Sequence, residues 1–173
     1  MKIISTSLLL ILLLISCSKK TEVKNFPFDS FVFSYAGLHH DNSIKFNNSD
    51  TIFLQRRYPE PKENFYVIIN SNIKEKLYKH LQSLNINKFK SEYSQNNLCD
   101  GSAYLLNISN NNKNKSIFVY GHTAPKELYN FIDSLSKFKD HLKFIPTKQV
   151  IDFGDLSTIL PPPPPPPLKT KTE

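Results

Sequence analysis

The chain has 173 residues, of which 39% are hydrophobic, 12% aromatic and 21% charged. These proportions exclude an intrinsically disordered chain and fit one globular domain of about 100 to 150 residues. The formal net charge is +7, but the basic residues are scattered, and the densest groups are the pairs Lys19-Lys20 and Arg56-Arg57. No stretch interleaves basic with stacking aromatic side chains, so we expect no nucleic-acid partner.

The N-terminal segment begins with Met1 and Lys2, continues as an uncharged run over residues 3–15 and ends at Ser16 and Cys17. A helix of these 13 uncharged residues would be about 20 Å long, whereas the hydrocarbon core of a bilayer is about 30 Å thick. The run is therefore too short for a comfortable membrane span. It predicts a signal peptide over residues 1–16.

The end of this segment, Leu14-Ile15-Ser16-Cys17, resembles the lipobox of bacterial lipoproteins. The resemblance covers the first 17 residues of the chain and implies that the Cys17 sulfur is alkylated by a diacylglycerol donor. It also implies cleavage just before Cys17 and acylation of the new amine, so that chains such as palmitate hold the protein at a membrane. The alternative is an uncleaved membrane helix with an incidental cysteine.

The residues after Cys17 are polar and lack helical periodicity, so residues 17–26 are expected to form a lipidated tether. Ser18 stands where some inner-membrane lipoproteins carry aspartate, which favours the outer membrane, on its periplasmic or surface-exposed side. If Cys17 is modified, Cys99 is left as the single thiol, and no intramolecular disulfide can form.

The middle of the chain carries strand patterns, of which the clearest places Phe31, Phe33 and Tyr35 at alternate positions. The segment 102–122 predicts a hairpin, because two apolar runs flank a polar asparagine-rich tip. With only 4 glycines in the chain, asparagine is expected in many of the turns. The strands are expected at 30–38, 43–46, 51–58, 65–69, 102–109 and 116–122, with a short last strand in 148–153.

Two helices are predicted between and after these strands. The first is capped by Asn70 or Ser71, and the second opens with Thr123 and Pro125. Each carries an apolar stripe at spacings of three and four residues. The stripes consist of Ile73, Leu77, Leu81 and Leu84 in the first helix and of Leu128, Phe131, Ile132 and Leu135 in the second.

This order of elements predicts an α+β fold, with an antiparallel sheet of about five to seven strands and two helices packed on one face. The domain is expected over residues 27–153, followed by a disordered proline-rich tail over 154–173. The arrangement and the Asn/Lys/Ile-rich style resemble small uncharacterised lipoprotein domains of Bacteroidota, a resemblance that transfers no functional residue. Within the tail, the seven prolines 161–167 favour a polyproline helix, which is either a ligand for an aromatic groove, a spacer or an unselected end.

Two clusters carry side chains of possible chemical use. His39, His40 and Asp41 are metal-ligand types, but adjacent residues on a strand face opposite ways and no third ligand follows at a recognisable spacing, so a polar turn is expected. Cys99, with Asp100, Gly101 and His122, could form a thiol and base, although a small buried cysteine beside a turn is the favoured reading. Asp29, Glu92 and Asp155 form no paired-carboxylate motif.

No catalytic residue, metal ligand or cofactor is therefore assigned, and Cys17 is the one predicted site of modification. Exposed tyrosines offer a binding face instead, because tyrosine combines apolar area with a hydroxyl. The sequence predicts a lipid-anchored, non-enzymatic envelope protein with a protein partner of unknown identity. An inhibitor or immunity-type protein acting on an envelope enzyme or toxin, and a small hydrolase or metal-binding protein, are the alternatives. The candidate tyrosines are Tyr58, Tyr66, Tyr93, Tyr104 and Tyr120.

Overall fold

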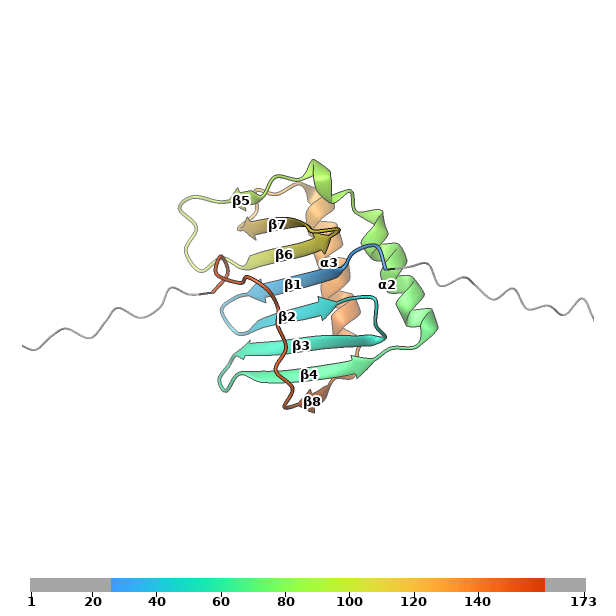
Figure 1. Cartoon of the computed structure of the whole chain (residues 1–173). Helices are drawn as coiled ribbons and strands as arrows, with labels where there is room; N and C mark the ends of the chain where they lie inside the picture. The colour runs from blue at the N-terminus through green and yellow to red at the C-terminus, as the bar shows by residue number, and fades with distance from the viewer. Residues whose placement is uncertain (1–25, 161–173) are drawn as a thin grey trace, which may run out of the picture.

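A computed structural model describes residues 26–160, and Figure 1 shows them as one sheet with two helices behind it. The sheet has eight strands in the order β5-β7-β6-β1-β2-β3-β4-β8, all antiparallel except the parallel pair β5 and β7. The predicted signal peptide, the proline run and residues 17–25 of the predicted tether lie outside the described residues. Phe26, the last residue of that tether, is instead buried in the main core. The strands are β1 (Ser30–Ala36), β2 (Asp41–Phe46), β3 (Thr51–Tyr58), β4 (Glu63–Ile68), β5 (Glu92–Ser94), β6 (Ala103–Asn110), β7 (Lys113–Tyr120) and β8 (Ile145–Thr147).

Both helices lie on the same face of the sheet, as predicted. α2 (Ser71–Ser83) begins after Asn70, whose side chain accepts a hydrogen bond from the Ile73 amide at 3.0 Å. α3 (Lys126–Asp140) begins after Pro125. Both apolar stripes pack into the main core with Phe31, Phe33 and Phe46 of the sheet. The α+β fold and its helical layer are therefore confirmed.

The sheet is larger than predicted, because two edge strands of three residues each were missed. The predicted last strand over 148–153 is wrong: β8 ends at Thr147, and the chain then crosses the sheet instead of pairing with it. The reason is visible in the hydrogen bonds. The carbonyl oxygens of Gln149, Asp152 and Asp155 accept from side chains of strand residues, so no backbone ladder forms.

Residues 148–160, here called the strap, run diagonally over the face of the sheet that the helices leave open (Figure 1). Phe153, Leu156 and Ile159 of the strap are buried against Val32 and Leu105 in a second, smaller core. The packed domain therefore extends to Ile159, past the boundary at residue 153 that the sequence suggested. The strap makes the sheet the middle of three layers.

Turns rely on asparagine and aspartate, as predicted from the shortage of glycine. Asn97, Asp100, Asn111 and Asn112 all have positive φ, between 51° and 64°. Asn111 and Asn112 form the two-residue tip between β6 and β7, where Asn110 pairs with Lys113. Asparagine tolerates this left-handed backbone better than most side chains do.

Candidate functional site

The best candidate site is a cavity of about 530 Å³ between the helix-facing side of the sheet and α3, a volume within the range of small-molecule pockets. We call it the tyrosine pocket. The sheet contributes side chains from the end of β1, the start of β6 and the turn after β1, and α3 contributes one of its faces. The residues that line it are Phe33, Tyr35, His40, Tyr104, Tyr129, Ile132, Asp133, Ser136, Lys139 and Asp140.

Aromatic rings form the sheet side of the tyrosine pocket. Tyr35 and Tyr104 are direct cross-strand partners, with ring centroids 5.4 Å apart and planes at 48°. His40 packs on Tyr35, at 4.8 Å between centroids, and Phe33 stacks with Tyr104 at 6.4 Å. Residues two apart on a strand face the same way, so the alternation of β1 places these rings on one surface.

Two of the three tyrosine hydroxyls are engaged by the protein. The Tyr35 hydroxyl shares a hydrogen bond of 3.2 Å with the Ser102 hydroxyl. The Tyr129 hydroxyl donates to the Gly121 carbonyl oxygen at 2.7 Å and accepts from the Ala124 amide at 3.3 Å. These bonds fix the two rings at the sides of the cavity.

The third hydroxyl, of Tyr104, has no hydrogen-bond partner among residues 26–160. Burial raises the pKa of Tyr104, and the nearby Tyr35, Tyr129 and Asp133 raise it further. The phenol therefore stays neutral and keeps a proton to donate. It is the one tyrosine hydroxyl of the pocket that is available to a ligand.

The rim of the tyrosine pocket is charged and comes from α3. Asp133, Ser136 and Asp140 follow Tyr129 at intervals of three and four residues, which places them on one helix face. Asp133 pairs with Lys137 at 2.7 Å, and Asp140 pairs with Lys139 at 3.3 Å. Both carboxylates remain about two-thirds exposed, so their remaining oxygens can accept further hydrogen bonds.

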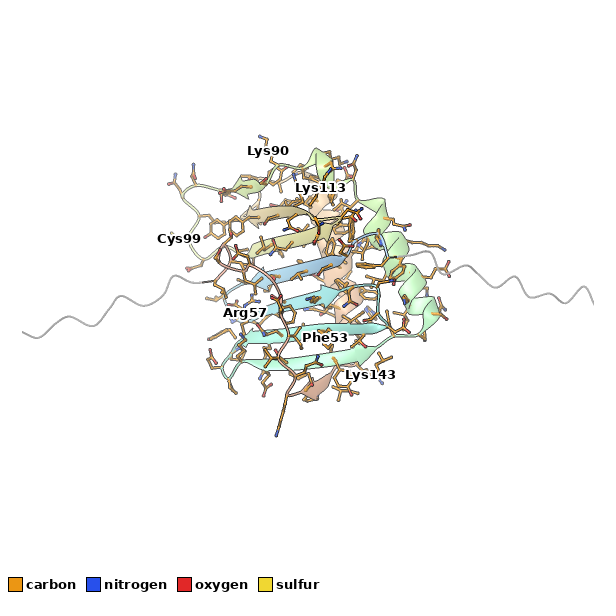
Figure 2. The ribbon with its side chains drawn as sticks, viewed as in Figure 1. Phe53, Arg57, Lys90, Cys99, Lys113 and Lys143 are labelled. Atoms are coloured by element: carbon orange, nitrogen blue, oxygen red, sulfur yellow. The ribbon has the colours of Figure 1, made fainter. Side chains whose placement is uncertain are left out.

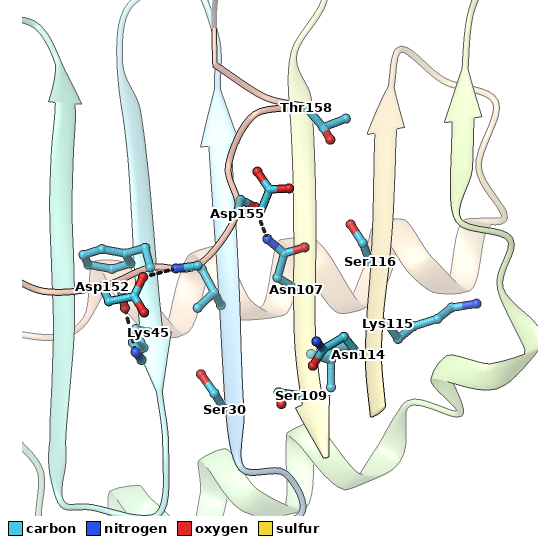
Figure 3. Close-up of a pocket in the computed structure, with 14 residues that line it drawn as sticks. Ser30, Lys45, Asn107, Ser109, Asn114, Lys115, Ser116, Asp152, Asp155 and Thr158 are labelled. Atoms are coloured by element: carbon cyan, nitrogen blue, oxygen red, sulfur yellow. Dashed lines mark hydrogen bonds between the residues drawn. The ribbon is translucent and has the colours of Figure 1, made fainter. Parts of the chain in front are cut away.

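A second cavity, the strap cleft, lies on the opposite face of the sheet between the strap and β6-β7 and has a volume of about 560 Å³. Figure 3 shows its wall of hydroxyl and amide side chains, which includes Ser30, Ser109, Asn114 and Ser116. Lys45 Nζ donates to the Asp152 carbonyl oxygen at 2.6 Å, and Asn107 Nδ2 donates to the Asp155 carbonyl oxygen at 2.6 Å. The Lys45 ammonium and the Asn107 amide are thus engaged in holding the strap.

His39 and His40 lie in the turn between β1 and β2, as predicted, whereas Asp41 begins β2. Asp41 Oδ1 accepts a hydrogen bond from the Gly37 amide at 3.0 Å, which closes the connection between β1 and β2. His39 and His40 are exposed, and of the two only His40 lines the tyrosine pocket. Within residues 26–160 no group of three or more His, Cys, Asp or Glu side chains is arranged to hold a metal ion.

The prediction that Cys99 is buried is wrong, because its side chain is exposed (Figure 2). Cys99 lies in a loop whose fold is set by Tyr120: the phenol donates to the Leu98 carbonyl oxygen at 2.9 Å and accepts from the Gly101 amide at 3.2 Å. The backbone amide of His122 donates a hydrogen bond to Gln95 Oε1 at 3.0 Å. No hydrogen bond between the Cys99 thiol and the His122 ring is found in the described part of the chain.

Of the five tyrosines proposed for a binding face, Tyr104 alone lines the tyrosine pocket. The Tyr120 hydroxyl supports the loop before β6, and the Tyr93 hydroxyl accepts from the Lys90 amide at 3.0 Å. Tyr58 is half exposed at the end of β3, and Tyr66 lies on β4; neither lines the tyrosine pocket.

Sequence reasoning missed the partners of Tyr104 in this pocket. Tyr35 was seen as part of an aromatic strand face, but its pairing with Tyr104 depends on strands that are far apart in sequence. The polar stripe on α3 was detectable from its spacing. Tyr129, Asp133, Ser136 and Asp140 follow one another at intervals of four, three and four residues beside the apolar stripe.

The fold and site thus define an α+β domain with an aromatic pocket between sheet and helix and with a strap over the opposite face. Residues 40–139, more than half of the chain, match the family described as Domain of unknown function (DUF6438). The protein belongs to this family. A search of curated proteins found no match to its sequence.

The matched range covers the two cavities unequally: it contains seven of the ten residues that line the tyrosine pocket but only seven of the fourteen that line the strap cleft. Seven residues of the tyrosine pocket, including Tyr104, Tyr129 and Asp133, lie within residues 40–139. The strap, which forms one side of the strap cleft, lies wholly outside that range. The tyrosine pocket is therefore the better candidate for a role that belongs to the family domain.

Proposed function

We propose that this protein is a lipid-anchored binding module of the bacterial cell envelope that contacts another macromolecule through its tyrosine pocket. The anchor rests on the lipobox Leu14-Ile15-Ser16-Cys17 and the short uncharged run before it. The helices of the described residues include none that is long and apolar enough to cross a bilayer.

The observation that carries the binding role is the uncommitted Tyr104 hydroxyl in an aromatic cavity. Tyrosine side chains contribute large, rigid contact area and a hydrogen-bonding group, and they are enriched among the residues that dominate binding energy. Tyr35, Tyr104 and Tyr129 are held by cross-strand pairing and by hydrogen bonds to the backbone, so little conformational entropy is lost when a ligand enters.

The anchor is tested by treating cells with globomycin, an inhibitor of the peptidase that processes lipoproteins. We expect an uncleaved, larger precursor to accumulate. A Cys17→Ala variant should stay at precursor size with or without the inhibitor, because it lacks the sulfur that must be alkylated before cleavage. Unchanged size of the unsubstituted protein under globomycin contradicts the proposed anchor.

The binding role is tested with a photo-crosslinking amino acid at Asp140, on the rim of the tyrosine pocket. The matched control carries the same amino acid at Lys90, an exposed position that lies outside the pocket. Irradiation of cells should give a covalent adduct of defined mass from position 140 and none from position 90. An adduct with an envelope enzyme or toxin would indicate the inhibitor or immunity-type role, and no adduct from position 140 contradicts the proposal.

A further inference from the structure

The tyrosine pocket combines three features that select for one kind of chemical group. Its sheet side presents the rings of Tyr35 and Tyr104 at 5.4 Å and 48°, and Tyr129 stands opposite on α3. The face of an aromatic ring carries partial negative charge. A cavity between several rings is therefore attractive to a positively charged group that has lost part of its water shell.

The second feature is the charge of the rim. Two carboxylates, Asp133 and Asp140, face one ammonium group, that of Lys139, among the residues that line the cavity. Lys139 is itself paired with Asp140 at 3.3 Å, so it is not free to bind an anion. Asp133 is likewise paired, with Lys137 at 2.7 Å, but both carboxylates are about two-thirds exposed, so these pairs are weak and the second oxygen of each carboxylate stays available to a cation.

The third feature is the position of Asp133 relative to Tyr104. The carboxylate lies close enough to contribute to the raised pKa of the Tyr104 phenol. A cation between these two groups would contact a ring face on one side and a carboxylate on the other. Neutral ligands such as saccharides also stack on tyrosine and can donate hydrogen bonds to carboxylates, but they gain no charge attraction from either the ring faces or the carboxylates.

We propose that the tyrosine pocket binds an organic cation, an alkylammonium group held by the rings of Tyr35, Tyr104 and Tyr129 and by the carboxylates of Asp133 and Asp140. This inference rests on the proposed function and names its ligand class. The cation has two sources with the same chemistry: a free amine, or the lysine side chain of a partner protein.

The test is isothermal titration calorimetry on the full-length protein, purified from membranes in a polyoxyethylene detergent. The probes are choline chloride and Nα-acetyl-lysine amide, with sodium chloride at equal ionic strength as the blank. We expect saturable binding of one or both probes at one site per chain. No saturable heat from either probe overturns the inference, and so does saturable binding of the neutral saccharide chitotriose with no response to the cations.

Variants assign the binding to the pocket. Tyr104→Ala should weaken the affinity by about tenfold, whereas Tyr104→Phe, which keeps the ring, should stay within about threefold. Asp133→Asn should weaken binding by about threefold and is a second reporter if Tyr104→Ala fails to fold. Tyr58→Ala removes a half-exposed tyrosine outside the pocket and should change nothing. Equal affinity of the unsubstituted protein, Tyr104→Ala and Asp133→Asn overturns the inference.

Adding choline as a competitor during photo-crosslinking at position 140 distinguishes a free amine from a partner's lysine. The same experiment separates the cation inference from the proposed binding of a macromolecule. Loss of the adduct in the presence of choline identifies a partner's lysine as the occupant. Probe binding without any adduct supports a free amine and removes the macromolecular partner. An adduct that forms although neither probe binds keeps the proposed function and overturns the cation.

Discussion

Ser34 and Ser43 are direct cross-strand partners whose hydroxyl oxygens lie 2.6 Å apart, and both side chains are completely buried. The guanidinium of Arg57 donates to the Ser43 hydroxyl and, at 3.0 Å, to the Tyr35 carbonyl oxygen. Burial lowers the pKa of Arg57, and the Asp41 carboxylate acts in the opposite direction. An arginine nevertheless stays protonated, so this buried charge depends on its hydrogen bonds.

The Ser43→Ala variant should lose about 2 kcal/mol of unfolding free energy, because it leaves the Ser34 hydroxyl and one Arg57 donor without a partner in a buried site. Ser116→Ala is the matched control, since Ser116 is exposed on the same face of the sheet. The control should stay within about 0.5 kcal/mol of the unsubstituted protein in urea denaturation. Equal stability of the two variants would show that the buried network contributes little.

The strap contains a second matched pair. Phe153 is 4% exposed in the smaller core, whereas Val150, three residues earlier, is 91% exposed. Phe153→Ala should destabilise the protein by about 3 kcal/mol and open the strap to limited proteolysis, while Val150→Ala should do neither. If both variants resist protease equally, the strap is held by its side chain-to-carbonyl hydrogen bonds instead.

The hairpin between β6 and β7 offers a test of asparagine in the left-handed region. Asn112 has a φ of 62°, so Asn112→Gly should leave the free energy of unfolding unchanged. Asn112→Ala should lower it by about 1 kcal/mol, because alanine is sterically disfavoured in the left-handed region and has no polar side chain to hydrogen-bond locally. Asn96→Ala, at an exposed loop position outside this region, is the control and should be neutral. Thermal unfolding monitored by circular dichroism measures all three variants.

His80 on α2 should make the fold sensitive to acid. Its ring stacks on Phe131, with centroids 4.6 Å apart, and burial lowers its pKa below the ordinary 6.5. The folded state therefore binds fewer protons at this site than the unfolded state does. The free energy of unfolding should consequently fall as the pH drops below about 6.5.

The His80→Gln variant lacks this titration and serves as the reference. Denaturant titrations from pH 8 to pH 5 should show the unsubstituted protein losing stability relative to the variant. A constant difference between the two proteins across this range would mean that His80 has the same pKa in both states.

Counting the thiols that react with a reagent tests the lipidation of Cys17, because Cys99 is exposed and reacts in the native protein. A thiol reagent should modify one cysteine per mature chain under native conditions, since Cys99 is accessible and the proposed lipid occupies the sulfur of Cys17. Cys99→Ser should reduce the count to zero in native and denatured protein alike. A remaining thiol in the denatured variant would contradict lipidation of Cys17.

Local patterns in the sequence predicted most elements of the fold. The apolar stripes of both helices and the alternation of β1 each reflect burial of one face, which periodicity reports directly. β5 and β8 were missed because strands of three residues are too short to show a period. The strap was taken for a strand because Val150, Ile151 and Phe153 are apolar, although only tertiary contacts decide which of them is buried.

The candidate site was predictable only in part. Tyr104 was noted for its residue type, but the pocket around it exists because β1 pairs with β6 across nearly seventy residues of chain. Cys99 was expected to be buried from the usual behaviour of free cysteine, and the loop held by Tyr120 overrides that tendency. Pairing between distant strands leaves no local signature in a single sequence.

The placement of Phe26 has a geometric consequence. Phe26 packs on Tyr78 of α2, next to the start of β1, whereas Tyr35 lies near the other end of that strand, about 15 Å or more away. Ile159 and Leu160 also lie by Gly37 at that far end. The described chain therefore enters the domain at the end of β1 that lies away from the Tyr35–Tyr104 ring pair, so the proposed lipid anchor and the proposed binding residues attach to opposite ends of the same strand.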